Sequence, residues 1–89
     1  MPPIDQSPSK MKRFAGELLH CSDALRKEEI LLFSDLAKLG QTWKDERFQH
    51  FDRLIGESAK ELAKFHTSAR RYADYLTAKA RAGEKFLRD

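Results

Sequence analysis

The feature of this chain that most restricts its fold is a register between two stretches of apolar residues. Nine pairs of residues, one member from each half of the chain, have position numbers that sum to 87. Within each half the members are spaced by alternating threes and fours, as on the buried seam of a coiled coil. The pairs are Leu39 with Phe48, Leu36 with Phe51, Leu32 with Ile55, Glu29 with Ser58, Leu25 with Leu62, Ser22 with Phe65, Leu18 with Ala69, Ala15 with Tyr72 and Met11 with Leu76. The pattern therefore predicts two helices folded back on each other.

The N-terminal end of the first helix is marked by serine and proline. Residues 1–7 contain two prolines and no apolar periodicity, so we expect a flexible leader. Ser7 suits an N-cap because Pro8 would then occupy the first helical position, and Ser9 is an alternative cap. With 89 residues, the chain makes one domain at most, which we place at 8–89.

The turn between the helices is expected at Gly40, Gln41 and Thr42. Gly40 is the type of residue that closes a helix in the left-handed conformation, and Thr42 with Asp45 resembles a capping box. The sequence thus predicts an all-α fold, an antiparallel hairpin with helices over about 8–39 and 43–88. The second helix would extend past the first by about 13 residues, over 77–89.

Apolar residues outside the seam predict a partner. Two helices bury only a thin strip between them, so an isolated hairpin would leave these residues exposed to solvent. Small side chains at one edge of the second helix would let another helix approach closely. The expected interface is Phe14, Leu19, Phe33, Leu54, Ala59, Ala73, Tyr75 and Ala80. We therefore expect the hairpin to form a four-helix bundle, either as a homodimer or with a second helical-hairpin protein, a monomeric hairpin being the alternative.

The basic residues suggest a different class of partner. The formal net charge is +3, and residues 1–43 carry six basic and six acidic groups, so the surplus lies in the second helix. Binding of nucleic acid phosphates is therefore the alternative function, and an ordinary solvated face is the commoner meaning of such charges. A membrane-surface role of the C-terminal overhang is a third possibility. The possible phosphate contacts are Lys60, Lys64, Arg71, Arg81, Lys85 and Arg88.

Catalytic and metal-binding patterns are not evident in the sequence. His20, His50 and His66 are expected to be solvated. Glu29, the charged residue of the seam, is expected to turn to solvent beside Arg26, the alternative being a buried polar residue that fixes the register. An inward Glu-x-x-His set of the kind that binds two metals in helical bundles is missing, and the single Cys21 provides no disulfide. We therefore expect a non-enzyme with no cofactor, no metal and no small-molecule substrate.

Hydropathy argues against a membrane protein. The longest apolar run, Ile30–Phe33, is far shorter than a membrane span, and the N-terminus lacks the apolar core of a signal peptide. We expect a cytoplasmic protein or one exported by a non-classical route.

The tryptophan at the turn completes a pattern that is similar to a known family. Trp43, Lys44 and Asp45 stand at the turn and aromatic residues follow down the second helix. Over residues 11–88 the chain resembles the WXG-motif proteins of type VII secretion, which are helical hairpins with Trp-x-Gly at the turn. Asp45 replaces the glycine, and no tyrosine is followed four residues later by an acidic residue near the C-terminus. The resemblance implies a bacterial homodimer or heterodimer that is secreted or acts as an adaptor.

Overall fold

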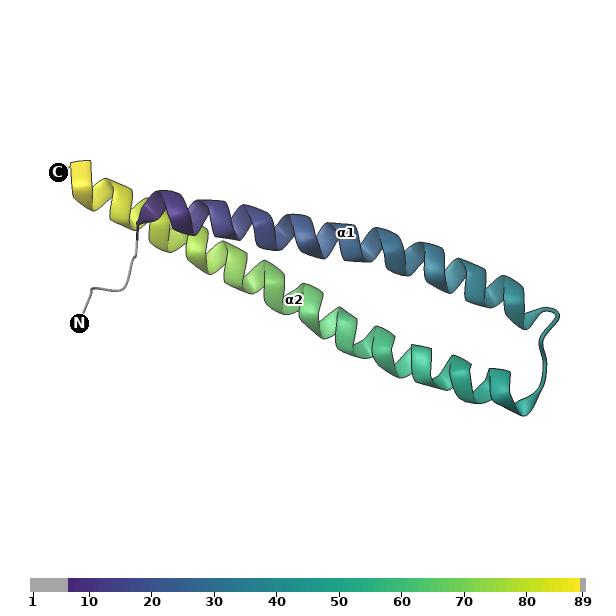
Figure 1. The fold of residues 1–89 in the computed structure, drawn as a ribbon. Helices are drawn as coiled ribbons and strands as arrows, with labels where there is room; N and C mark the ends of the chain where they lie inside the picture. The colour runs from purple at the N-terminus through teal and green to yellow at the C-terminus, as the bar shows by residue number, and fades with distance from the viewer. Residues whose placement is uncertain (1–6, 89) are drawn as a thin grey trace, which may run out of the picture.

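Two α-helices form the computed structural model, which describes residues 7–88 and the side chains of residues 7–85 (Figure 1). Helix α1 spans Pro8–Gly40 and helix α2 spans Glu46–Arg88. They run antiparallel and contact each other in a hairpin that measures 66 × 26 × 16 Å. The predicted all-α helical hairpin is therefore confirmed. Of the predicted leader, 1–7, all but Ser7 lies outside the described residues, as does Asp89.

Helix α1 begins as predicted, with Ser7 as the N-cap and Pro8 at the first helical position. The Ser7 hydroxyl makes no capping bond to the backbone and lies 3.0 Å from the hydroxyl of Ser9. The carbonyl of Ser7 accepts the N–H of Met11 at 3.0 Å. The fixed φ of proline therefore starts this helix without side-chain capping.

Helix α1 does not end on a left-handed glycine, and this prediction is wrong. Within the described part of the chain, no residue has a positive φ. Gly40 has a different role: a Cβ at this position would lie 2.7 Å from Cζ of Phe48. The glycine therefore lets the ring of Phe48 approach the backbone of α1 at the turn.

The expected capping box is also wrong. The Thr42 hydroxyl donates back to the carbonyl of Leu39 at 3.3 Å, so it does not cap α2. Asp45 caps α2 instead, because its Oδ1 accepts the N–H of Phe48 at 3.0 Å. The connection consequently occupies residues 41–45, and α2 begins three residues later than predicted.

The face that α2 turns toward α1 differs from the predicted seam at every second position. The positions that agree are Phe48, Ile55, Leu62, Ala69 and Leu76. The other inward positions are Ala59, His66, Ala73 and Ala80, whereas the predicted Phe51, Ser58, Phe65 and Tyr72 are exposed. Ala80 is 0% exposed and Tyr72 is 64% exposed. Small residues face α1 because they let the two helices approach closely, which a phenyl or phenol ring at the same position would prevent.

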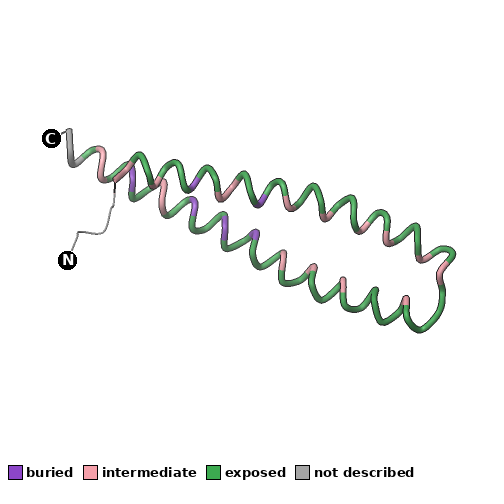
Figure 2. The backbone as a smooth tube through the Cα atoms, in the orientation of Figure 1, coloured by how far each residue is buried: buried purple, intermediate pink, exposed green. Residues whose placement is uncertain are grey.

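The two helices are close together at the chain ends and spread apart toward the turn (Figures 1 and 2). All the buried residues of the described part lie in the half away from the turn: Ala15, Ser22, His66, Ala69, Ala73 and Ala80. The inward residues near the turn are the larger Phe33, Leu36, Phe48 and Ile55, which are only half-buried. Residue size along the seam thus accounts for the wedge shape, and we call the two parts the closed half and the open half.

The closed half continues further along α2 than predicted. A Cβ at Gly83 would lie 3.2 Å from Cγ of Pro8, so the start of α1 rests against this glycine. One turn away, Lys12 Nζ lies 2.6 Å from Oε1 of Glu84. The predicted overhang from residue 77 is therefore wrong, because α1 covers α2 as far as Gly83.

Candidate functional site

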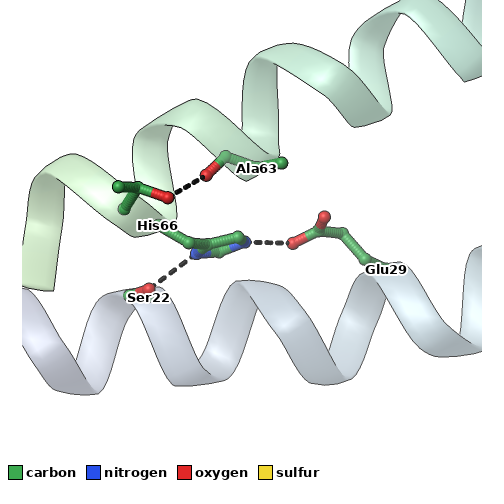
Figure 3. Close-up of polar contacts among 5 residues, drawn as sticks. Ser22, Glu29, Ala63 and His66 are labelled. Carbon is green, nitrogen blue, oxygen red and sulfur yellow. Dashed lines mark hydrogen bonds and ion pairs between the residues drawn. The ribbon is translucent and has the colours of Figure 1, made fainter.

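A polar layer crosses the closed half of the hairpin and is centred on His66 (Figure 3). His66 is 6% exposed, and its ring connects α2 to two residues of α1. Nδ1 lies 2.6 Å from the hydroxyl of Ser22, and Nε2 lies 2.6 Å from Oε2 of Glu29. The expectation that His66 and Glu29 are solvated is therefore wrong. Every buried side-chain nitrogen or oxygen atom of the described residues has a hydrogen-bond partner.

Serine, histidine and glutamate linked by hydrogen bonds are also the parts of a hydrolase catalytic triad. The surroundings of Ser22 determine whether this layer could act as one. Ser22 is 5% exposed, and its hydroxyl is engaged by Nδ1 of His66 at 2.6 Å. It also lies in the middle of α1, where the nearby backbone N–H groups are used by the helix and cannot form an oxyanion hole. The layer is suited to fixing the helix register rather than to acyl transfer.

The sequence contained a signal for this layer. Ser22 and Glu29 are seven residues apart and share one face of α1. If α2 is shifted by one residue from the predicted register, Ser22 faces His66 instead of Phe65. Ser22, Glu29 and His66 then meet. Pairing Ser22 with the larger, apolar Phe65 instead leaves this polar set apart.

The predicted turn motif forms a small aromatic cluster. The rings of Trp43 and Phe48 have centroids 5.4 Å apart and are tilted by 58°. Trp43 is half-buried, whereas Lys44 and Asp45 are exposed. The backbone N–H of Phe48, followed by the indole N–H of Trp43, lowers the pKa of Asp45 below its ordinary value of 3.8. The Asp45 carboxylate therefore holds the start of α2 and the tryptophan together.

One side of the hairpin carries most of the large exposed apolar side chains. Successive residues of an α-helix are rotated by about 100°, so Phe14 and Leu32 lie about 80° to one side of Ser22. Phe65 and Tyr72 lie about 100 to 120° from His66 in the same rotational sense. In an antiparallel pair, the same sense from the seam means the same side of the molecule. We call this side the apolar face, and it contains the exposed residues Phe14, Leu32, Leu39, Phe51, Leu54, Phe65 and Tyr72.

The predicted partner interface is only partly on this surface. Phe14 and Leu54 belong to the apolar face, and Tyr75 is exposed on the outer side of α2. Ala59 is half-buried in the seam, and Leu19 and Phe33 are half-buried on the opposite side of the hairpin. Placing Ala73 and Ala80 in an outer interface is wrong, because both are buried between α1 and α2.

The side opposite the apolar face carries two adjoining hollows between the helices. The first, of about 330 Å³, is lined by Leu19, Ser22, Asp23, Arg26, His66, Thr67, Arg70 and Arg71, and we call it the arginine cleft. The second, of about 400 Å³, shares three of these residues and adds Glu29, Ile30, Phe33 and Ala63. We call it the apolar hollow. Because Arg26, His66 and Thr67 line both, the two form one groove.

The predicted phosphate contacts remain on the surface of α2. Lys60, Lys64, Arg71, Arg81 and Lys85 are all exposed, and the side chain of Arg88 lies outside the described residues. Lys64 Nζ lies 3.2 Å from Oε1 of Glu61, so part of its charge is already balanced. From the helix rotation, the five described residues fall about 60 to 160° from His66, on the outer surface next to the arginine cleft.

The described residues contain no group of three or more His, Cys, Asp or Glu side chains that could hold a metal ion. Over the same part of the chain, neither helix has a stretch long and apolar enough to cross a membrane. No family model, no curated protein and no solved structure matches this chain.

Proposed function

We propose that this chain is a non-enzymatic protein-interaction module that self-associates through its apolar face to form a four-helix bundle. The observation that carries the proposal is the exposure of large apolar side chains on one side of the hairpin. Phe14 is 54% exposed and Tyr72 is 64% exposed, at the same end of the closed half. Contiguous exposed apolar residues of this kind mark interaction surfaces.

The total exposed area supports a partner of this size. A compact folded chain of 10.3 kDa exposes about 5,400 Å² by the usual scaling with mass. The hairpin exposes 7603 Å². The excess of roughly 2,000 Å² is more than the roughly 800 Å² that each partner buries in an interface of standard size. A second copy would cover this surface, because an isologous contact places the same apolar face on both sides.

The self-association test uses two neighbouring leucines. Leu32 belongs to the apolar face and is 51% exposed, whereas Leu31 is 60% exposed and points away from both the seam and that face. In sedimentation equilibrium we expect the unaltered chain near twice 10.3 kDa. Leu32→Glu should weaken association at least about tenfold, because a charge would be buried without a partner. Leu31→Glu should leave the mass unchanged.

A monomer at all concentrations would overturn the homodimer. An equal effect of the two substitutions would mean that the apolar face is not the contact. If the chain is poorly helical or aggregates by itself, the homodimer is likewise rejected in favour of a second hairpin protein as the partner.

The more specific proposal is a WXG-like role as a secreted dimer or an adaptor in a type VII-like secretion system. It is supported by the hairpin shape and by the half-buried Trp43 at the turn. If it is correct, a gene for another helical hairpin or for a secretion ATPase should lie beside the gene for this chain. Co-expression with that hairpin protein should yield a stable complex, and failure to associate would contradict the role.

Nucleic acid binding is the second candidate. The basic residues of α2 support it because they gather on one outer surface of that helix, with Lys60, Arg71 and Arg81 among them. Retention on a heparin or DNA column that falls steeply with salt would favour this function. Substitution of Lys60 and Arg81 by glutamine should then reduce the retention, and weak, salt-independent retention would exclude it.

A further inference from the structure

The groove opposite the apolar face has an uneven distribution of charge. Arg26, Arg70 and Arg71 line the arginine cleft together with a single carboxylate, that of Asp23. Within the described part of the chain, none of these three arginines makes an ion pair, although Lys12, Arg13 and Lys64 do. The cleft therefore presents an excess of positive charge. Guanidinium groups bind carboxylates in a bidentate manner.

The floor of the groove does not compete for these arginines. The Glu29 carboxylate is bonded to Nε2 of His66, and the ring is bonded on its other side to Ser22. The Thr67 hydroxyl donates to the carbonyl of Ala63 at 3.2 Å. The polar side chains of Ser22, Glu29, His66 and Thr67, which line the groove, are thus already hydrogen-bonded within the hairpin. The donors that remain available to a ligand are those of the arginines.

The apolar hollow limits the kind of anion that would bind. Ile30 is 68% exposed and Phe33 is half-buried beside it, immediately next to the shared residue Arg26. A free inorganic anion would leave these two side chains in water. An acidic segment of a polypeptide that also carries a large apolar side chain would satisfy both parts of the groove, because extended chains present neighbouring side chains a few ångströms apart.

We propose that this groove binds an acidic segment of a partner protein. Its carboxylates pair with Arg26, Arg70 and Arg71, and an adjoining apolar side chain covers Ile30 and Phe33. The inference deepens the proposed interaction function, but it uses the side of the hairpin opposite the apolar face. A self-associated hairpin therefore keeps the groove open, so the two proposals can fail independently.

The test uses the full chain and two short peptides, acetyl-Glu-Leu-Glu-Glu-amide and its neutral counterpart acetyl-Gln-Leu-Gln-Gln-amide. We expect the acidic peptide to shift the backbone amide NMR signals of Arg26, His66 and Arg70, and the neutral peptide to leave them in place. The affinity should fall as salt is raised, because the arginines are exposed. The Arg26→Gln/Arg70→Gln double variant should bind about tenfold more weakly. Arg53→Gln, an exposed arginine of α2 that does not line the groove, is the matched control.

Equal shifts with both peptides, or none with either, would overturn the proposal. Inorganic phosphate is the third probe: if it shifts the same signals with equal affinity, the groove is a small-anion site and the peptide assignment is wrong. The Leu32→Glu variant should bind the acidic peptide as the unaltered chain does, which separates this site from self-association. Far-ultraviolet circular dichroism of each variant verifies that the hairpin is still folded.

Discussion

His66 makes both of the hydrogen bonds that join the two helices in the polar layer. Its ring is buried, and both nitrogens are bonded to α1. In the neutral ring, Nε2–H donates to the Glu29 carboxylate and Nδ1 accepts the Ser22 hydroxyl, so each group has a partner. Polar layers of this kind specify register, because any slip between the helices leaves a buried group without its bond. The layer thus restricts the hairpin to one alignment.

Substitution of His66 should show how much stability the layer contributes. We expect His66→Ala to lower the free energy of unfolding by about 2 to 3 kcal/mol, since it opens a cavity and leaves Ser22 and Glu29 without partners. Ser22→Ala removes one bond and no large volume, and should cost about 1 kcal/mol. Urea unfolding at one fixed chain concentration measures both values. Equal, negligible losses would show that the layer does not stabilise the fold.

The Asp45 cap should make stability depend on pH in the acidic range. The pKa of Asp45 is lower in the folded chain than its ordinary value of 3.8, so the ionised form is favoured by folding. Its contribution is complete above the ordinary value and is lost as the pH falls through the lowered pKa. Asp45→Asn keeps a capping oxygen but does not titrate. The unaltered chain should melt at a higher temperature than this variant at neutral pH, and the difference should shrink as the pH falls through the lowered pKa of Asp45.

A difference in melting temperature that stays constant over this range would mean that the carboxylate charge does not matter. Because asparagine keeps the capping hydrogen bond and lacks the charge, that outcome would assign the stabilisation to the hydrogen bond alone.

At the level of the helices, the sequence determined the number, direction and approximate ends of the elements. It did not determine the face of α2, nor the seam of α1 near the turn, where the predicted Leu32 and Leu39 are exposed. Both possible seams contain Ile55, Leu62 and Ala69 and differ by one residue at alternate positions. Periodicity alone cannot distinguish them. The decision depends on interhelical distance, because alanines allow a close approach and aromatic residues do not. The polar layer and the groove depend on the same distinction, because both require the correct face of α2, and only the layer has a signal in the sequence.

The sequence predicts where the turn lies along the chain, but it does not predict the backbone conformation of the turn. Glycine at position 40 predicts a left-handed helix end, because this is the commoner reason for glycine there. Its actual role is to admit the ring of Phe48, a contact between the two helices that depends on the register. Short-range rules of capping do not include such contacts.

Two glycine substitutions in α1 should have opposite effects. A Cβ at Gly16 would meet no atom within 4 Å, so Gly16→Ala should stabilise the hairpin by about 1 kcal/mol through helix propensity. Gly40→Ala gains the same propensity but displaces the ring of Phe48 from its contact with Trp43, and we expect a net loss of about 1 kcal/mol. Thermal unfolding monitored by circular dichroism compares the two. A similar gain from both would show that the Phe48 ring moves without cost.

At the level of the whole molecule, the hairpin has two unlike sides. The apolar face suits a second copy, and the opposite side has the arginine cleft and the apolar hollow. Between them, the seam is filled by small residues in the closed half and by larger ones in the open half. This arrangement lets a dimer form without covering the groove.

The reactivity of the single cysteine, Cys21, tests whether the apolar face is covered in a dimer. Cys21 is exposed and lies on the side of the apolar face, about 100° from Ser22. Its rate of reaction with a thiol reagent should fall as chain concentration rises, because the second copy covers it. In Leu32→Glu the rate should stay high at every concentration. A rate that is independent of concentration in the unaltered chain would contradict a dimer through this face.

The position of the closed half has a consequence for how the chain folds. The bonds of His66 to Ser22 and Glu29 join residues 44 and 37 positions apart, and the residues near the turn have no contacts of equal burial. Loop closure costs more entropy as the loop lengthens, and folding slows as contacts become less local. A hairpin usually closes from its turn outward, but here the earliest contacts to form are the weakest. We therefore expect the contacts of the closed half, rather than those beside the turn, to limit the rate of folding.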